Sequence, residues 1–203
     1  MVLKIFIYGM AVTLPAALIE MSFSSFLKSI NLSSALTLAL YFLIGVALVE
    51  EIIKYLVVKF GVLKNPEFDE PVDAMIYMII AGLGFAAIEN ILILFPLTQP
   101  YLLEKTALAI SGRFIGATLL HALCSANIGF FLALSFFKAK NRFPLLAVGF
   151  LISIILHGLY NIAITMEGWP RFLILATILI GLFVIVLAEF KKVKKLLSIC
   201  QEN

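Results

Sequence analysis

The apolar residues of this chain fall into six long runs, each long enough to cross a lipid bilayer. A membrane-spanning helix needs roughly 20 apolar residues, because each residue adds about 1.5 Å and the hydrocarbon core is about 30 Å thick. The runs cover residues 5–21, 33–60, 72–95, 107–137, 143–166 and 169–190. This pattern predicts an all-α, polytopic membrane protein, a bundle of about six transmembrane helices.

Composition agrees with this class of protein. The 203 residues are 63% hydrophobic and 13% charged, whereas soluble domains average about 25% charged residues. Little chain remains outside the runs, so we predict a single integral-membrane domain over residues 1–203. A signal peptide is an alternative reading of the first run, because Lys4 precedes a short apolar stretch. The two cysteines, Cys124 in a run and Cys200 in the tail, do not indicate a disulfide framework.

The basic residues predict how the chain is oriented. Lys and Arg in short loops stay on the cytoplasmic side. Three basic residues fall on one predicted face, namely Lys28, Lys105 and Arg171, and ten fall on the other: Lys4, Lys59, Lys64, Lys138, Lys140, Arg142, Lys191, Lys192, Lys194 and Lys195. We therefore expect a multi-pass protein of the cell membrane with both termini in the cytoplasm. The net charge of +3 and the C-terminal KKVKK indicate contact with anionic lipid headgroups and not with nucleic acid.

The second run contains three ionisable residues, Glu50, Glu51 and Lys54. Each charge at the centre of a bilayer costs about 2.5 to 3.5 kcal/mol on insertion scales, so the group needs a reason to be there. Lys54 lies four residues after Glu50 and three after Glu51, so both carboxylates can reach the ammonium on one side of a helix. Lys54 neutralises one carboxylate and leaves the other as a candidate acid or base. The alternative is that EExxK only links neighbouring helices.

Three further runs carry buried polar groups. The third contains GLGFAAIEN, whose small residues permit close helix contact and whose Glu89 and Asn90 add polarity. Glu89 alternatively has only a structural role, as a protonated group bonded to a neighbouring helix. The two histidines of the chain lie in the fourth and fifth runs, each on a stripe of small and polar residues. In the fourth run a GxxxG formed by Gly112 and Gly116 is followed by residues at intervals of four, His121, Ser125 and Gly129; in the fifth run the residues at intervals of four are Gly149, Ser153, His157 and Asn161. Two histidines at matching depth favour a catalytic role, although a lone histidine is more often a hydrogen-bonding group in the core.

The first run, with Pro15, and the sixth, with no charge over residues 172–188, are interpreted as scaffold.

In order and spacing, these motifs resemble those of the PrsW-type intramembrane proteases, which belong to a larger grouping with the CAAX-prenyl and bacteriocin-processing proteases. The resemblance covers residues 33–166 and rests on EExxK, the stretch from Asp73 to Tyr77, Glu89-Asn90, His121 with Arg113 upstream, and HGLYN at 157–161. It implies an active centre formed by Glu50, Glu51, His121, His157 and Asn161, with Lys54, Glu89, Asn90 and Arg113 in support. Met78 departs from the pattern, because relatives tend to have a small residue after the tyrosine.

The implied activity is hydrolysis of peptide bonds in membrane-embedded or membrane-associated proteins or peptides. It needs a base to deprotonate water and donors to stabilise an oxyanion, and no Ser or Cys lies in a convincing nucleophile context. Two mechanisms remain open: a glutamate with His121 activates the water directly, or His121, His157 and a glutamate such as Glu51 bind zinc. HExxH is absent, so the sequence does not choose between them. The alternative functions are a proton-coupled carrier and a scaffold subunit of a membrane complex.

Overall fold

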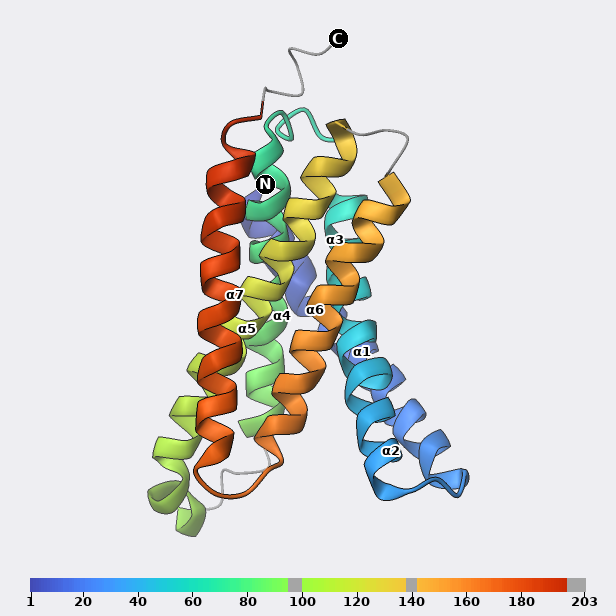
Figure 1. Cartoon of the computed structure of the whole chain (residues 1–203), viewed down its shortest axis with the longest axis vertical. Coiled ribbons are helices and arrows are strands. Elements are labelled where there is room, and N and C mark those ends of the chain that lie inside the picture. The colour runs from blue at the N-terminus through green and yellow to red at the C-terminus, as the bar shows by residue number, and fades with distance from the viewer. Residues whose placement is uncertain (95–99, 138–141, 197–203) are drawn as a thin grey trace.

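A computed structural model describes residues 1–94, 100–137 and 142–196; the side chains at 94, 100–111, 113 and 137 lie outside this description. The elements are all helical: α1 (Val2–Ser29), α2 (Ser34–Leu40), a π-helical segment η1 (Tyr41–Leu48), α3 (Val49–Gly61), α4 (Pro71–Leu94), α5 (Pro100–Phe137), α6 (Arg142–Ile164) and α7 (Pro170–Val193). Because α2, η1 and α3 follow one another without a break, six helices within the described ranges are long and apolar enough to cross a membrane. The predicted all-α, six-helix membrane architecture is confirmed (Figure 1).

The first helix is longer than its apolar run. The run ends at residue 21, whereas α1 continues to Ser29. The hydroxyls of Ser22, Ser25 and Ser29 each donate to a backbone carbonyl three or four residues earlier. These bonds satisfy the polar side chains within the helix. The helix therefore extends beyond the point at which the sequence becomes more polar.

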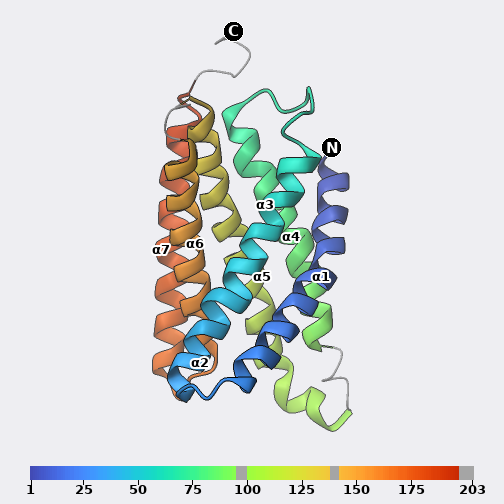
Figure 2. The same ribbon diagram turned by 90° about the vertical axis from the view of Figure 1, so that its right-hand side faces the viewer.

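The helix α5 is the centre of the bundle. In its membrane-spanning stretch 72% of residues are buried, against 17% for α7. The α5 helix packs against α4, α6 and α7, and α1 packs on the other side of α4 (Figure 2). The outer helices expose large apolar side chains such as Leu18, Ile180 and Val184. These surfaces match the hydrocarbon of a bilayer, and the buried polar groups collect around α5. Met78, the residue that departs from the family pattern, is fully buried in the core beside Tyr77.

The start of α1 and the end of α7 lie at one end of the bundle, as six crossings require (Figure 1). The ammonium of Met1 lies 3.6 Å from Glu67 Oε2 in the connection between α3 and α4. This end also holds the start of α6 and the end of α7. The basic residues Lys4, Lys59, Lys64 and Arg142 therefore belong to one face of the protein, as the sequence predicts.

The helices α1 and α4 cross at two glycines. A Cβ added at Gly9 would collide with the carbonyl oxygen of Ala81, and one added at Gly84 would collide with the carbonyl oxygen of Phe6. Because backbone atoms, not flexible side chains, occupy the space, a methyl group at either position would push the helices apart. The small residues of GLGFAAIEN thus permit the close contact that the sequence predicts: Gly84 faces α1, and a Cβ added at Gly82 would meet Ser125 on α5.

We expect Gly84→Ala to destabilise the protein, because the helices must separate to admit the methyl group. Overpacking of this kind costs about 1–3 kcal/mol. Gly181→Ala on α7 is the matched control, since a Cβ there would have no atom within 4 Å. Thermal unfolding in one detergent should show a lower Tm for Gly84→Ala and an unchanged or higher Tm for Gly181→Ala. Equal Tm values would contradict the close crossing.

Candidate active site

The site begins with the three ionisable residues of α3, directly after the π-helical segment. Glu50, Glu51 and Lys54 have at most 2% exposure. Lys54 Nζ donates to Glu51 Oε1 over 2.6 Å. Only one of the two carboxylates therefore hydrogen-bonds to the ammonium, although the helical spacing allowed both to reach it. Glu51 is the neutralised carboxylate, and Glu50 turns towards the histidines.

His121 on α5 is held between α3 and α4. Its Nε2 lies 2.5 Å from Glu89 Oε2, and its Nδ1 lies 3.1 Å from Lys54 Nζ. An ammonium can only donate, so Nδ1 accepts and the hydrogen of the ring is on Nε2, the nitrogen beside Glu89. The imidazole is thus fixed in one tautomer and one orientation by groups from two other helices. Glu89, to which the family resemblance assigns a supporting role, thus lies beside His121.

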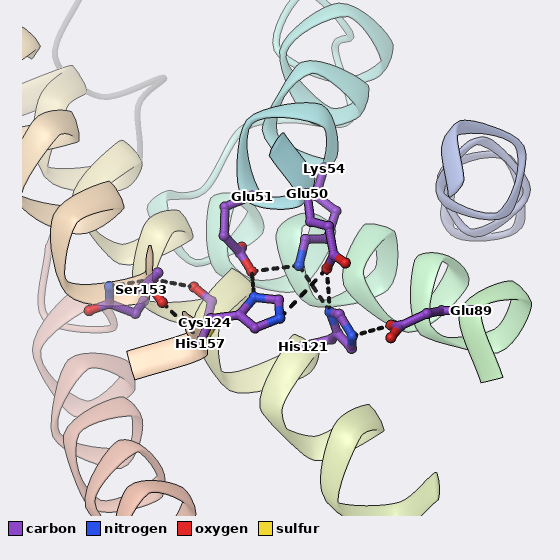
Figure 3. A network of polar contacts seen from close by, with 9 residues as sticks. Glu50, Glu51, Lys54, Glu89, His121, Cys124, Ser153 and His157 are labelled. Atoms are coloured by element: carbon purple, nitrogen blue, oxygen red, sulfur yellow. Dashed lines mark hydrogen bonds and ion pairs between the residues drawn. The ribbon is translucent and has the colours of Figure 1, made fainter. Parts of the chain in front are cut away.

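His157 on α6 is oriented in the same manner. Its Nδ1 lies 2.8 Å from Glu51 Oε1 and donates to this carboxylate, which leaves the lone pair of Nε2 facing the centre of the site. The two imidazole rings are nearly perpendicular, with centroids 5.0 Å apart. Each histidine therefore has one nitrogen bonded to a carboxylate and the other directed inward (Figure 3).

Glu50 lies between the two inward-facing nitrogens. Its Oε2 is 3.6 Å from His121 Nδ1 and 3.6 Å from His157 Nε2. This buried oxygen accepts no hydrogen bond from the described residues. A buried oxygen without a hydrogen bond is costly unless it has a purpose. The unbonded oxygen of Glu50 is therefore the point of the site at which a ligand or a water is expected to bind.

A second polar layer joins α5 to α6 next to the histidines. Asn127 Nδ2 donates to Ser153 Oγ (2.9 Å) and to the carbonyl of Gly149 (3.0 Å). Ser153 in turn donates to the carbonyl of Cys124 over 2.9 Å. The sequence placed Ser153 on the inward stripe but did not single out Asn127, which lies off the four-residue repeat of its own helix. An amide in an apolar run was the signal that could have found it.

Of the remaining predicted residues, two lie near the site and one lies outside the described side chains. Asn90 donates to Thr118 Oγ1 on α5 over 3.0 Å, next to Glu89 on the same helix. Asn161 lies one turn beyond His157 and lines a cavity with Glu50 and Glu89. The side chain of Arg113 lies outside the described residues. Among the others, the structure brings together Glu50, Glu51, Lys54, Glu89, His121 and His157.

The cavity has a volume of about 420 Å³ and leads from Glu50 to the end of α6. Side chains of α1, η1, α4 and α6 form its walls; the polar ones are Thr13, Glu20, Tyr41, Glu89, Asn161 and Thr165. Glu20 is a residue that the sequence interpretation missed, since it assigned the first run to scaffold. A carboxylate inside an apolar run is itself a functional signal, and that rule would have identified it.

The donor set fits a metal ion. Glu50, His121 and His157 each offer one ligand atom, and these atoms lie within 4.8 Å of one another. Two imidazoles and a carboxylate are a usual ligand set for catalytic zinc. Glu89 and Glu51 hold the opposite ring nitrogens, as carboxylates behind zinc-bound histidines do. The grouped carboxylate is Glu50, whereas the sequence suggested Glu51. Lys54 donates to His121 Nδ1, so a metal at that nitrogen would replace this hydrogen bond.

Comparison with known proteins agrees with the geometry. Residues 1–188 match the family described as PrsW family intramembrane metalloprotease. The protein named Protease PrsW of Geobacillus kaustophilus is 32% identical over 197 residues, which is 96% of this chain and 78% of that protein. Protease PrsW of Oceanobacillus iheyensis is 30% identical over 193 residues, 95% of this chain and 82% of that protein. No solved structure is similar enough to match. The chain therefore belongs to the PrsW family and is an intramembrane protease.

Proposed function

We propose that this protease cuts its substrates by activating a water at Glu50, His121 and His157, with a bound metal ion assisting. The observation that carries the proposal is Glu50 Oε2, which lies 3.6 Å from an inward-facing nitrogen of each histidine and accepts no hydrogen bond from described residues. Glu50 also lines the cavity, so a water and a peptide bond can reach it. A candidate base, the inward nitrogens of two histidines and a cavity that admits substrate thus meet at Glu50.

In this proposal Glu50 moves the protons. Its carboxylate takes a proton from the attacking water and later delivers it to the nitrogen of the leaving amine. Glu51 does not act as the base, because its Oε1 already accepts from Lys54 and His157. Glu51 instead fixes the tautomer of His157, and Glu89 fixes that of His121.

Asn161 is proposed to position the substrate carbonyl. It lines the same cavity as Glu50 and lies on the same helix as His157. An amide can donate to an oxygen that becomes negative as the water attacks. Arg113 keeps its proposed supporting role from the family resemblance alone.

Glu50 Oε2 and the inward nitrogens of His121 and His157 would hold the metal, and zinc is the ion that this ligand set favours. The other oxygen of Glu50 would then take the proton from water. A metal there would polarise the substrate carbonyl and make water acidic enough to react near neutral pH. The carboxylates behind the histidines support this assignment, since they orient each ring for its inward nitrogen to bind.

The substrates are proposed to be membrane-embedded or membrane-associated proteins or peptides. The catalytic group lies within the apolar part of the bundle, where a helical peptide bond is shielded by its own hydrogen bonds. A segment must therefore unwind locally before it can be cut, and Gly, Pro or small residues near the cut favour this.

We expect Glu50→Gln and Glu51→Gln to differ in stability although both lose activity. Glu50 makes no hydrogen bond in the described chain, so its replacement should leave Tm nearly unchanged. Glu51 is half of a fully buried ion pair, and removing one partner of such a pair costs about 3–5 kcal/mol. Cleavage of a helix-broken single-span peptide and thermal unfolding should be measured on both variants. Full activity in Glu50→Gln would refute Glu50 as the base.

The double variant Glu51→Gln/Lys54→Met is the control for this comparison. It removes both charges of the pair, so it should recover much of the stability that Glu51→Gln loses. Activity should stay absent, because His157 no longer has a carboxylate at Nδ1. A double variant as unstable as Glu51→Gln would show that the ion pair is not the cause.

The metal is tested by its content in purified protein. Wild type should bind close to one zinc per chain, and His157→Ala should bind much less because it loses one of three ligands. Glu89→Gln should weaken binding about 10–100-fold, since it removes the carboxylate behind His121. Glu189→Gln on α7, a buried carboxylate outside the site, should bind as wild type does. Metal-free protein with full activity would exclude the metal mechanism.

The orientation is proposed from the positive-inside rule. Reporter fusions after Lys64 and Asn203 should be cytoplasmic, and fusions near Lys28 and Glu167 should be external. Lys64 and Lys28 lie on either side of the second crossing. The same location for these two fusions would contradict the six-helix topology.

A further inference from the structure

We propose that a groove between α1 and α3 binds an anionic phospholipid, with the phosphate at Lys4 and one acyl chain lying along the two helices. The groove has a volume of about 490 Å³ and is separate from the cavity that reaches Glu50. The proposed mechanism uses none of the residues that line it. The inference is therefore independent of the proposed function.

The side of the groove that α1 supplies has a charged end and an apolar body. Its residues are Lys4, Tyr8, Ala11, Val12 and Pro15. They are spaced three or four apart, apart from one adjacent pair, and so lie on one face of the helix. Lys4 is the charged residue among the described side chains that line the groove. One ammonium followed by apolar surface is complementary to an anionic headgroup followed by an acyl chain.

The helix α3 supplies the other side of the groove and its base. Its lining residues are Ile53, Leu56, Val57, Phe60 and Gly61. The two helices lie side by side (Figure 2), and a Cβ added at Gly61 would lie 2.7 Å from Ile5 Cδ1. Val57 is buried, whereas Tyr8 and Phe60 are exposed. The groove is therefore a closed-bottomed channel whose open side faces the surroundings of the bundle.

The length of the groove matches one leaflet of a bilayer. From Lys4 to Pro15 the helix α1 rises by about 16 Å. Half of the hydrocarbon core is about 15 Å thick. Lys4 lies close to the start of α1 at Val2, so the charged end of the groove is at headgroup level and the other end is near the middle of the membrane. A partner helix would cross both leaflets and would need a groove about twice as long.

The charge at the headgroup end has no anion in the described protein. Lys4 is exposed and makes no ion pair with another described residue; its ammonium lies 5.5 Å from the centre of the Tyr8 ring. Lys59 is similar, since its ammonium lies over the rings of Tyr55 and Phe60 at 5.9 and 5.6 Å. A phosphate is the anion that lipid supplies at this depth, and a Lys ammonium binds it as a point charge.

The headgroup must provide the selectivity. An acyl chain gains little by moving from the bilayer to an apolar groove, because both surroundings are equally apolar. One lysine near an anionic lipid surface increases affinity about fivefold. A lipid bound in this way would link α1 to α3, the helix that carries Glu50 and Glu51.

The test places a fluorescent probe at the groove. The tryptophan of the chain, Trp169, is replaced by Trp169→Phe, and Phe60→Trp introduces a tryptophan at the rim of the groove. Liposomes contain phosphatidylcholine and a fraction of phosphatidylglycerol or phosphatidylcholine brominated on its acyl chains, which quenches a tryptophan in contact with it. We expect brominated phosphatidylglycerol to bind at the probe at least about fivefold more tightly than brominated phosphatidylcholine. Both leaflets contain the lipid, so the orientation of the protein does not affect the result.

Two variants in this background separate a bound lipid from general attraction to the surface. Lys4→Gln should remove most of the preference and Lys4→Arg should retain it, whereas Lys191→Gln, an exposed lysine on α7, should have no effect. Ala11→Phe fills the groove and should also remove the preference, whereas Ala188→Phe on the exposed side of α7 should not. Thermal unfolding in detergent checks that each variant is folded, and Ala11→Leu replaces Ala11→Phe if the larger side chain lowers Tm.

Three results would overturn the proposal. Equal quenching by the two brominated lipids would show that the groove does not select an anion. A preference that Lys4→Gln removes but both groove-filling variants leave intact would show only diffuse attraction of anionic lipid to the surface. Displacement of the brominated lipid by an added single-span peptide, or by raising the density of protein in the liposomes, would identify a helix or a second copy of the chain as the occupant.

Discussion

The structure depends on the burial of charged groups in a bundle that has almost no water to solvate them. Glu51, Lys54 and His157 form a continuous set of hydrogen bonds with distances of 2.6 and 2.8 Å. Such a set is tolerable because every charge has a partner of opposite sign or a donor. Removing any member leaves an uncompensated group, so α3 and α6 must keep one arrangement. The packing of these helices and the chemistry of the site therefore have the same cause.

Glu50 and Glu51 are adjacent in sequence, yet their surroundings differ. A step of one residue turns a helix by about 100°, so Glu51 faces His157 and Lys54 while Glu50 faces the cavity and both inward nitrogens. Glu51 is held in place by two hydrogen bonds, whereas Glu50 Oε2 accepts none from the described residues. In the proposed mechanism, the two neighbouring glutamates thus supply one structural anion and one reactive anion, so a single glutamate would not suffice.

The sequence predicted the number of helices, their approximate ranges and the inward stripes, because apolar length and four-residue spacing are local properties. It also identified Glu50, Glu51, Lys54, Glu89, His121 and His157 as candidates, since ionisable groups in apolar runs are rare. Which carboxylate faces which histidine could not be predicted, because that depends on the rotation and crossing of α3, α5 and α6. The π-helical segment η1 also left no sequence signal, although it directly precedes Glu50. Asn127 and Glu20 could have been found by the same rule that found the others.

Placing the reactive carboxylate at the inner end of a cavity resolves a conflict between catalysis and stability. Hydrolysis needs water and an unpaired polar atom, whereas a membrane bundle is destabilised by both. The cavity limits that exposure to one face of Glu50, and the histidines are sealed by Glu51 and Glu89 on their far sides. The close crossing of α1 and α4 at Gly9 and Gly84 joins the two helices that supply part of the cavity wall.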